Sequence, residues 1–151
     1  MSIHSDELYQ QVILEHNKRP KNFIKLDPCT HEAEGYNPLC GDHLSVFARV
    51  SPEGIIEEVS FLGDGCAISK ASASMMTAAL KGKPVDEARK LFDEFHGLLT
   101  RTLDPEKDPH HLGKLTVFSG IWKYPSRVKC AILAWHTLKG ALDQQKTVST
   151  E

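Results

Sequence analysis

Alternating hydrophobic and polar residues identify a β-hairpin in the first half of the chain. Apolar side chains recur at every second position over residues 44–50, and a second run rich in branched and aromatic residues spans 56–62. A period of two is typical of strands with one buried face. Pro52-Glu53-Gly54 supplies turn residues between the two runs. The pattern therefore predicts two neighbouring antiparallel strands.

Apolar repeats of three and four residues predict a helix on either side of this hairpin. The first helix follows a capping Ser5 and stops before Pro20. The second is rich in Ala, Ser and Met, starts at or next to Cys66 and covers residues 67–81. Residues 21–43, between the first helix and the hairpin, lack periodicity and are predicted as loop or short extended pieces.

The second half of the chain is predicted to be helical. An apolar stripe over residues 85–97 indicates a third helix, and a long amphipathic helix begins around Pro125 and gives way to a polar tail at 144–151. Residues 102–113 between them form a polar loop with two prolines. Strands followed by a run of helices are typical of an α+β domain, here a small antiparallel sheet of about three strands covered by helices.

Composition places the chain among ordinary globular proteins. It has 151 residues, 40% hydrophobic and 25% charged, enough for one domain with a substantial core. We expect residues 1–151 to form that domain, with flexible tails at 1–5 and 144–151. A net charge of −2 argues against a nucleic-acid binder that gains its affinity by neutralising phosphates. No apolar run approaches the ~18 residues of a membrane helix, so we expect no membrane contact and a cytoplasmic location.

Three of the four cysteines occupy positions that suit metal binding or nucleophilic chemistry. Cys66 and Cys130 lie near the predicted starts of two helices, where the helix dipole and free N–H groups stabilise negative charge. Cys40 lies in a predicted turn that contains Pro and Gly, where we expect its side chain to be accessible. Lys70 and Arg127 add positive charge nearby. A thiolate is both a metal ligand and a nucleophile, so this pattern leaves both kinds of chemistry open.

A shared metal ion would explain a meeting of several thiolates. Cys40, Cys66 and Cys130 together with Asp42, two residues after Cys40, would complete the four ligands of tetrahedral Zn²⁺. Their long sequence intervals are not those of zinc fingers, however. A lone cysteine is more often a small buried hydrophobe, and an aspartate after a glycine often only caps a turn.

Other candidate ligands are weaker. Cys29 adjoins no helix start or partner carboxylate, and we interpret it as structural. His43 and the pair His110-His111 carry nitrogen donors. A histidine pair in an acidic loop with prolines is more often exposed polarity than a metal site.

Three separated motifs resemble the U-type iron–sulfur cluster assembly proteins, the family of IscU and the NifU N-terminal domain. In chain order they are Leu39-Cys40-Gly41-Asp42, the run over residues 61–76 around Gly65-Cys66-Ala67, and Arg127-Val128-Lys129-Cys130 with Leu133-Ala134-Trp135. The resemblance covers roughly residues 6–143. It implies the fold of IscU and SufE, a three-stranded antiparallel sheet covered by helices. It also implies that Cys40, Asp42, Cys66 and Cys130 converge on one metal site.

Two features resemble the SufU-like branch of this family. The scaffold branch has a histidine directly before its third cysteine, where this chain has Lys129, and the SufU-like branch has an insertion that matches residues 101–124. The resemblance therefore implies a Zn²⁺-dependent sulfurtransferase. Such a protein takes persulfide sulfur from a SufS-like cysteine desulfurase and supplies a downstream iron–sulfur assembly scaffold. Cys40, on a turn, is the expected sulfur acceptor. Arg127 is expected either to stabilise the developing thiolate or to be a solvated surface residue.

Two alternatives to sulfur transfer stay open. The same four residues would also suit a scaffold that builds a transient [2Fe–2S] cluster, because an oxygen ligand from Asp42 makes such a cluster labile. The chain would otherwise act as a non-catalytic zinc adaptor of the desulfurase, without ever carrying a persulfide.

Overall fold

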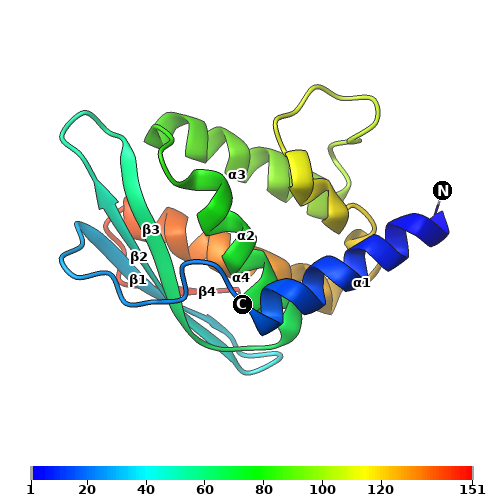
Figure 1. Ribbon diagram of the computed structural model, residues 1–151, viewed down its shortest axis with the longest axis horizontal. Coiled ribbons are helices and arrows are strands. Elements are labelled where there is room, and N and C mark those ends of the chain that lie inside the picture. Colours follow the sequence, from blue (N-terminus) through cyan, green and yellow to red (C-terminus); the bar gives the residue numbers. More distant parts are fainter. Residues whose placement is uncertain (1, 151) are drawn as a thin grey trace.

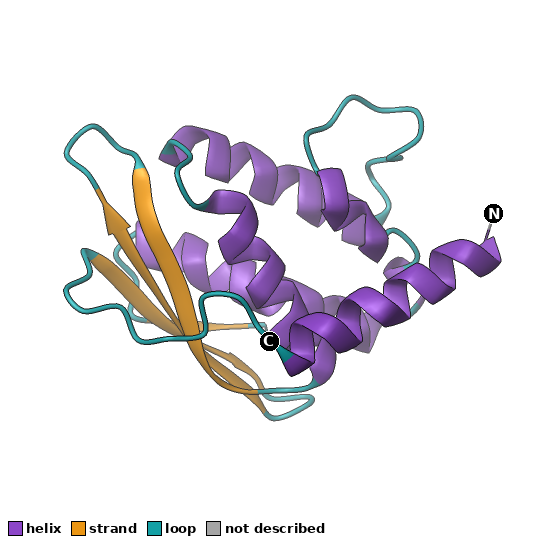
Figure 2. Ribbon diagram, in the orientation of Figure 1, coloured by secondary structure: helices purple, strands orange, loops and turns teal. Residues whose placement is uncertain are grey.

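A four-stranded sheet with helices packed against one face forms the body of the molecule (Figures 1 and 2). The structure is a computed structural model that describes residues 2–150, with side chains described from residue 7. The sheet order is β3-β2-β1-β4. The strands are β1 (His31–Asn37), β2 (Asp42–Val50), β3 (Ile56–Asp64) and β4 (Thr147–Ser149). The helices are α1 (Ser2–Lys18), α2 (Ala67–Leu80), α3 (Val85–Thr100) and α4 (Pro125–Leu142), with short 3₁₀ turns η1 (Gly113–Phe118) and η2 (Ile121–Lys123). The predicted α+β class, a small sheet covered by helices, is confirmed.

The predicted hairpin is formed by β2 and β3, which pair antiparallel. Its turn is closed by hydrogen bonds from the Ser51 and Gly54 amides, and Gly54 has a φ of 83°, which side chains with a Cβ rarely adopt. Leu44, Val46 and Phe61 are fully buried beneath the helices. The period-two pattern therefore identified the correct inner face.

Strand β1 lies in the segment that the sequence predicted as loop or short extended pieces. It pairs antiparallel with β2, and its buried positions are Ala33, Gly35 and Asn37. These inward residues are small or polar because α4 packs closely on β1. A Cβ at Gly35 would clash with the Thr137 hydroxyl of α4. The close helix contact therefore removed the hydrophobic signal on which strand prediction depends.

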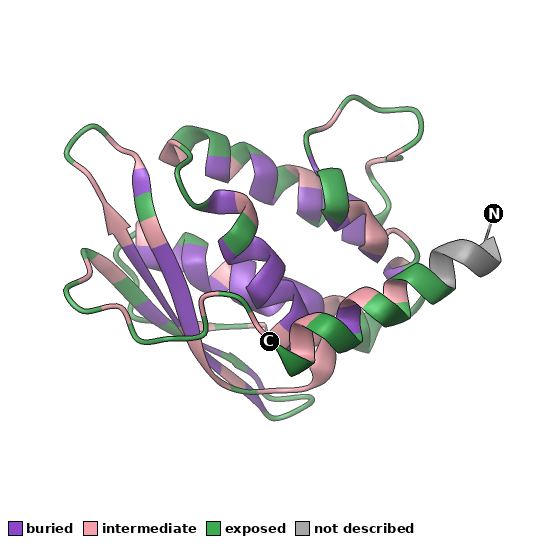
Figure 3. Ribbon diagram, in the orientation of Figure 1, coloured by how far each residue is buried: buried purple, intermediate pink, exposed green. Residues whose placement is uncertain are grey.

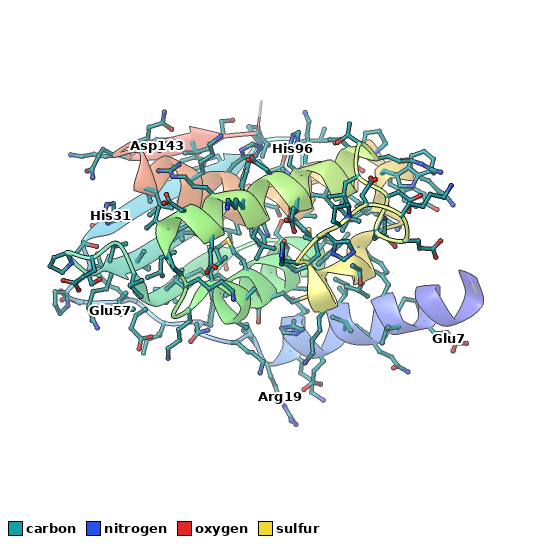
Figure 4. The ribbon with its side chains drawn as sticks, turned by 90° about the horizontal axis from the view of Figure 1, so that it is seen from above. Glu7, Arg19, His31, Glu57, His96 and Asp143 are labelled. Carbon is teal, nitrogen blue, oxygen red and sulfur yellow. The ribbon has the colours of Figure 1, made fainter. Side chains whose placement is uncertain are left out.

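Strand β4 is a fourth strand of the sheet, and the sequence did not predict it. It lies in the segment 144–151, expected to be a tail, and pairs parallel with β1, so the sheet is mixed rather than purely antiparallel. Val148 packs so closely on Gly140 of α4 that a Cβ at position 140 would clash with the Val148 side chain. Arg89 of α3 forms an ion pair of 2.8 Å with Asp143, which Figure 4 shows beside β4. Packing on α4 thus fixes a strand of only three residues.

Helix α1 begins at Ser2, earlier than the predicted capping Ser5, whose side chain lies outside the described residues. The helix packs on α2 and η1 through Ile13, and most of its other described side chains are exposed or half-buried (Figure 3). Arg19, directly after the helix, projects away from the body of the molecule (Figure 4). Residues 2–5, which the sequence assigned to a tail, lie in the first turns of this helix.

Helices α2 and α4 form the centre of the helical layer. Small residues on α2, including Ser72, let the two helices approach closely, and Trp135 Nε1 donates a hydrogen bond of 3.2 Å to Ser72 Oγ. Phe95 of α3 stacks on Trp135 with ring centroids 4.7 Å apart. In the described part of the chain, no helix is both long enough and apolar enough to cross a membrane. The packing of α4 on α2 and the sheet fixes where its first turns lie.

Candidate metal centre

Three chain segments meet at one end of the sheet. The turn between β1 and β2 carries Cys40 and ends at Asp42, the first residue of β2, and Gly41 in this turn has a φ of 74°. The start of β2 pairs with the end of β3 (Figure 1), so Cys66, just after β3, lies beside Asp42. Helix α4 directs Cys130, in its second turn, toward the same point.

Three of the four residues predicted as ligands, Cys40, Asp42 and Cys130, form one donor group, and Cys66 lies beside it. The Cys40 and Cys130 sulfurs are 3.6 Å apart, and the Cys66 sulfur is 3.9 Å from Asp42 Oδ2. Donor atoms of Cys40, Asp42 and Cys130 all lie within 4.8 Å of one another. Cys66 lies outside this group of three and adjoins it through Asp42, whose Oδ1 accepts a hydrogen bond from the Cys66 amide at 2.8 Å. Residues far apart in sequence thus form one cluster of two sulfurs and a carboxylate, with the Cys66 sulfur at its edge.

The chemistry and spacing of these donors suit a tetrahedral thiophilic ion. Sulfur ligands at ~2.3 Å from Zn²⁺ lie about 3.8 Å from one another along the edge of a tetrahedron. The distance of 3.6 Å between the Cys40 and Cys130 sulfurs is close to this edge length. Three thiols and one carboxylate oxygen also complete the coordination number of four. Iron accepts the same donor types, so the geometry fits a metal ion without selecting one.

Asp42 is held by a buried hydrogen-bond network. Its Oδ1 accepts from the Cys66 amide at 2.8 Å, and its Oδ2 accepts from Ser69 Oγ at 2.7 Å and Asn37 Nδ2 at 3.1 Å. Asn37 and Ser69 are both fully buried. No sequence motif singled out these two residues. The only signal for Ser69 was its place one turn after the predicted helix start at Cys66, where a hydroxyl faces the cap.

Negative charge at the metal-free cluster settles on Cys66. Hydrogen bonds from the Cys130 thiol, the Ser69 hydroxyl and the Ser69 amide lower the pKa of Cys66 from 9.0 to about 6, against opposing effects of burial and of Asp42. Donating to Cys66 and being buried raise the pKa of Cys130. One thiolate and one thiol therefore share a proton between them.

The lowered pKa of Cys66 predicts a pH profile for its alkylation in metal-free protein. Because the thiolate is the reactive form and the folded pKa is below the ordinary value, the rate should rise as the pH passes through about 6 and level off well below 9. Residue-resolved mass spectrometry after brief iodoacetamide treatment measures this rate. Ser69→Ala removes one donor and should move the midpoint upward. A Cys66 midpoint near 9 in the folded protein would contradict the network.

Comparison with known proteins decides the family. The sequence profile of the NifU-like N-terminal domain matches residues 8–144, which is nearly the whole chain. The chain belongs to the NifU-like N-terminal domain family. The chain is also similar to individual curated proteins and solved structures over most of their length.

Two curated relatives carry different functional names. The chain is 39% identical over 137 residues to the iron–sulfur cluster assembly scaffold protein IscU of Streptococcus pyogenes, covering 91% of this chain and 84% of that protein. It is 36% identical over 142 residues to the zinc-dependent sulfurtransferase SufU of Bacillus subtilis, covering 93% of each. A crystal structure of a SUF-system scaffold protein from Fervidobacterium islandicum superposes with a TM-score of 0.80 at 31% identity, covering 90% of this chain and 97% of that one. A role in iron–sulfur cluster assembly and the IscU- and SufU-like fold follow.

Around this NifU-like cluster, Arg127 has a different environment from the one the sequence suggested. It is exposed on the first turn of α4, and its guanidinium stacks on the Tyr124 ring at 4.4 Å. Among described residues no hydrogen bond joins it to the four candidate ligands. The Tyr9 hydroxyl is buried and has no hydrogen-bond partner among the described residues. Burial raises its pKa, and the positive charge of Arg127 opposes this by lowering it. Lys70 lies over the Phe23 ring at 5.1 Å.

The remaining candidate ligands make contacts away from the cluster. His110 contacts the Pro105 carbonyl through Nε2 and accepts from the Leu112 amide, so both its nitrogens hold the loop before η1. His111 pairs with Glu94 of α3.

His43 points to the outer face of the sheet, where it pairs with Glu34 at 2.9 Å. Cys29 lies in the loop before β1, and burial raises its pKa. None of the four belongs to the donor cluster found in the described part of the chain.

Proposed function

We propose that the protein is a zinc-dependent sulfurtransferase of iron–sulfur cluster assembly. In this proposal it accepts persulfide sulfur from a SufS-like cysteine desulfurase and passes it to a downstream assembly scaffold. One observation carries the proposal: Cys40 is exposed on a turn, whereas Cys130 and Asp42 are buried and Cys66 is half-buried. The cluster therefore combines three anchored donors with one thiol that a partner protein can reach.

The chain's own residues would hold the ion at this site. Cys66 at the cap of α2, Cys130 in α4 and Asp42 in β2 are rigidly placed, and Cys40 completes the set. Zn²⁺ bound there would keep the thiols deprotonated at neutral pH. The amide and hydroxyl donors on Asp42 keep its carboxylate directed at the sulfurs.

Sulfur transfer to Cys40 is a thiol–persulfide exchange. The Cys40 thiolate attacks the terminal sulfur of the desulfurase Cys–S–SH group. A new S–S bond forms at Cys40, the S–S bond of the donor breaks, and the desulfurase cysteine leaves as a thiolate. The proton stays on the transferred sulfur, and the persulfide oxidation level passes from one chain to the other. No further oxidant or reductant is required.

The residue before Cys130 supports this proposal. Lys129 occupies the position where the scaffold branch has a histidine, which removes a nitrogen donor from the neighbourhood of the cluster. The chain also aligns over 93% of its length with a relative named as a zinc-dependent sulfurtransferase.

A cluster-building scaffold is the second candidate. Relatives from Streptococcus pyogenes and Fervidobacterium islandicum are described as scaffold proteins. An aspartate ligand beside three cysteines would also suit a [2Fe–2S] cluster that must be released.

Persulfide mapping separates these functions. The full chain, purified anaerobically, is analysed for bound metal, incubated with a cysteine desulfurase and cysteine, and digested for mass spectrometry. Sulfur transfer predicts a colourless protein with one zinc and an added sulfur atom on Cys40. Bound iron with visible absorbance would favour the scaffold instead. Zinc without any persulfide on this chain would leave only an adaptor of the desulfurase.

A further inference from the structure

Asn37 contacts three of the four candidate ligands. Its side-chain amide Nδ2 lies 3.1 Å from Asp42 Oδ2 and 3.5 Å from Cys130 Sγ. Its backbone carbonyl accepts hydrogen bonds from the amides of Cys40 and Gly41 at 3.3 and 2.9 Å, which closes the turn that carries the exposed thiol. Asn37 itself is fully buried. A single residue therefore joins the strand end, the turn and the first part of α4.

The orientation of the Asn37 amide is fixed by its partners. The Asp42 carboxylate only accepts hydrogen bonds, so the Asn37 nitrogen faces the cluster and the oxygen faces away. On that other side Thr150 Oγ1 donates a hydrogen bond of 3.1 Å to Asn37 Oδ1. The amide can therefore keep its donors on Asp42 and Cys130 without leaving its own oxygen buried and unpaired.

Thr150 is held by the strand that sequence analysis did not predict. Strand β4 pairs with β1, and beyond its end the Thr150 amide donates to the Tyr36 carbonyl at 3.0 Å. This backbone bond places the Thr150 hydroxyl opposite Asn37. A chain of hydrogen bonds therefore runs from the end of β4 through Thr150 and Asn37 to the cluster.

We propose that Asn37, oriented by Thr150, is a positioning residue that fixes Asp42 and Cys130 for metal binding. The inference rests on the proposed metal site, but not on sulfur transfer. Residues that hydrogen-bond to metal ligands orient them and tune their basicity, and their loss typically weakens metal affinity by about 10–100-fold. Asn37→Ala removes both donors while leaving all four candidate ligands in place.

Zinc affinity and the cobalt spectrum test this role in the full chain. Zinc affinity is measured by competition with a chromophoric chelator, and the thiolate charge-transfer and d–d bands of the Co²⁺-loaded protein report ligand geometry. We expect Asn37→Ala to bind Zn²⁺ about 10–100-fold more weakly and to show altered Co²⁺ bands. Thr150→Val, which keeps the backbone pairing of β4, should produce a smaller shift in the same direction.

Asn22→Ala is the matched control. It removes another side-chain amide, one that donates to Thr77 Oγ1 at 2.9 Å, between the segment after α1 and helix α2. We expect it to lower stability while leaving zinc affinity and the Co²⁺ bands unchanged. An equal loss of affinity in this control would reduce the Asn37 effect to general destabilisation and overturn the inference.

Three further results distinguish the inference from the proposed function. Wild-type affinity and spectra in Asn37→Ala would overturn the positioning role, and if that variant does not fold, unchanged values in Thr150→Val would do so. A wild-type chain that binds zinc but never carries a persulfide would overturn sulfur transfer alone. A wild-type chain that binds no zinc would overturn both.

Discussion

Replacing Cys40 by alanine should abolish sulfur acceptance while leaving the fold intact. Cys40 is exposed, so the substitution should change the free energy of unfolding by no more than about 0.5 kcal/mol apart from any effect of lost metal. The nucleophile itself is removed, and none of the other three donors is as accessible. We expect no persulfide above background on this chain after incubation with desulfurase and cysteine, and no stimulation of desulfurase turnover.

Two companion variants make this result specific. Cys29→Ala removes a thiol outside the cluster and should behave as the parent does. Asp42→Ala weakens the site but keeps the nucleophile, so a persulfide should still form on Cys40 at reduced yield. If Cys40→Ala stimulated desulfurase turnover as well as the parent, Cys40 would not be the acceptor. If Asp42→Ala were as inactive as Cys40→Ala, loss of the metal alone would explain both results.

The parts of the fold that could be predicted are those where a buried face leaves a regular pattern. The β2–β3 hairpin shows a period of two, and α2 and α4 begin within one residue of their predicted starts. Strand β1 left no such pattern, because contact with α4 demands Gly35 and Ala33 where a strand would ordinarily carry large apolar residues. Strand β4 is too short and polar for any periodicity, and only its pairing with β1 defines it.

The candidate site divides in a similar way. Helix starts and a turn singled out Cys40, Cys66 and Cys130 from the residues themselves, but their long intervals did not predict that they meet. That expectation came from family resemblance. The residues that hydrogen-bond to Asp42 could not be predicted for another reason. Asn37 contacts partners in β2, α4 and the segment after β4, and no local sequence pattern predicts such contacts.

The metal should contribute strongly to the stability of this fold. A metal-free cluster places a thiolate, a thiol and a carboxylate within contact distance at one end of the sheet. A ligand present at 1,000 times its dissociation constant stabilises the folded state by about 4 kcal/mol. For a chain of this length, one kcal/mol corresponds to roughly 2–4 °C in the midpoint of thermal unfolding. We therefore expect removal of zinc to lower the midpoint by about 8–16 °C.

Differential scanning calorimetry before and after dialysis against a strong chelator measures this shift, and added zinc should restore the original midpoint. Cys29→Ser is the matched control, because it loses a thiol that lies outside the cluster and should keep the full response to zinc. Cys66→Ser and Cys130→Ser each remove one anchored sulfur, so their midpoints should respond much less to the chelator. An unchanged melting curve after verified metal removal would show that the folded state gains nothing from the ion, and the four donors would then not form a shared site. A shift equal in all four proteins would place the ion elsewhere on the chain.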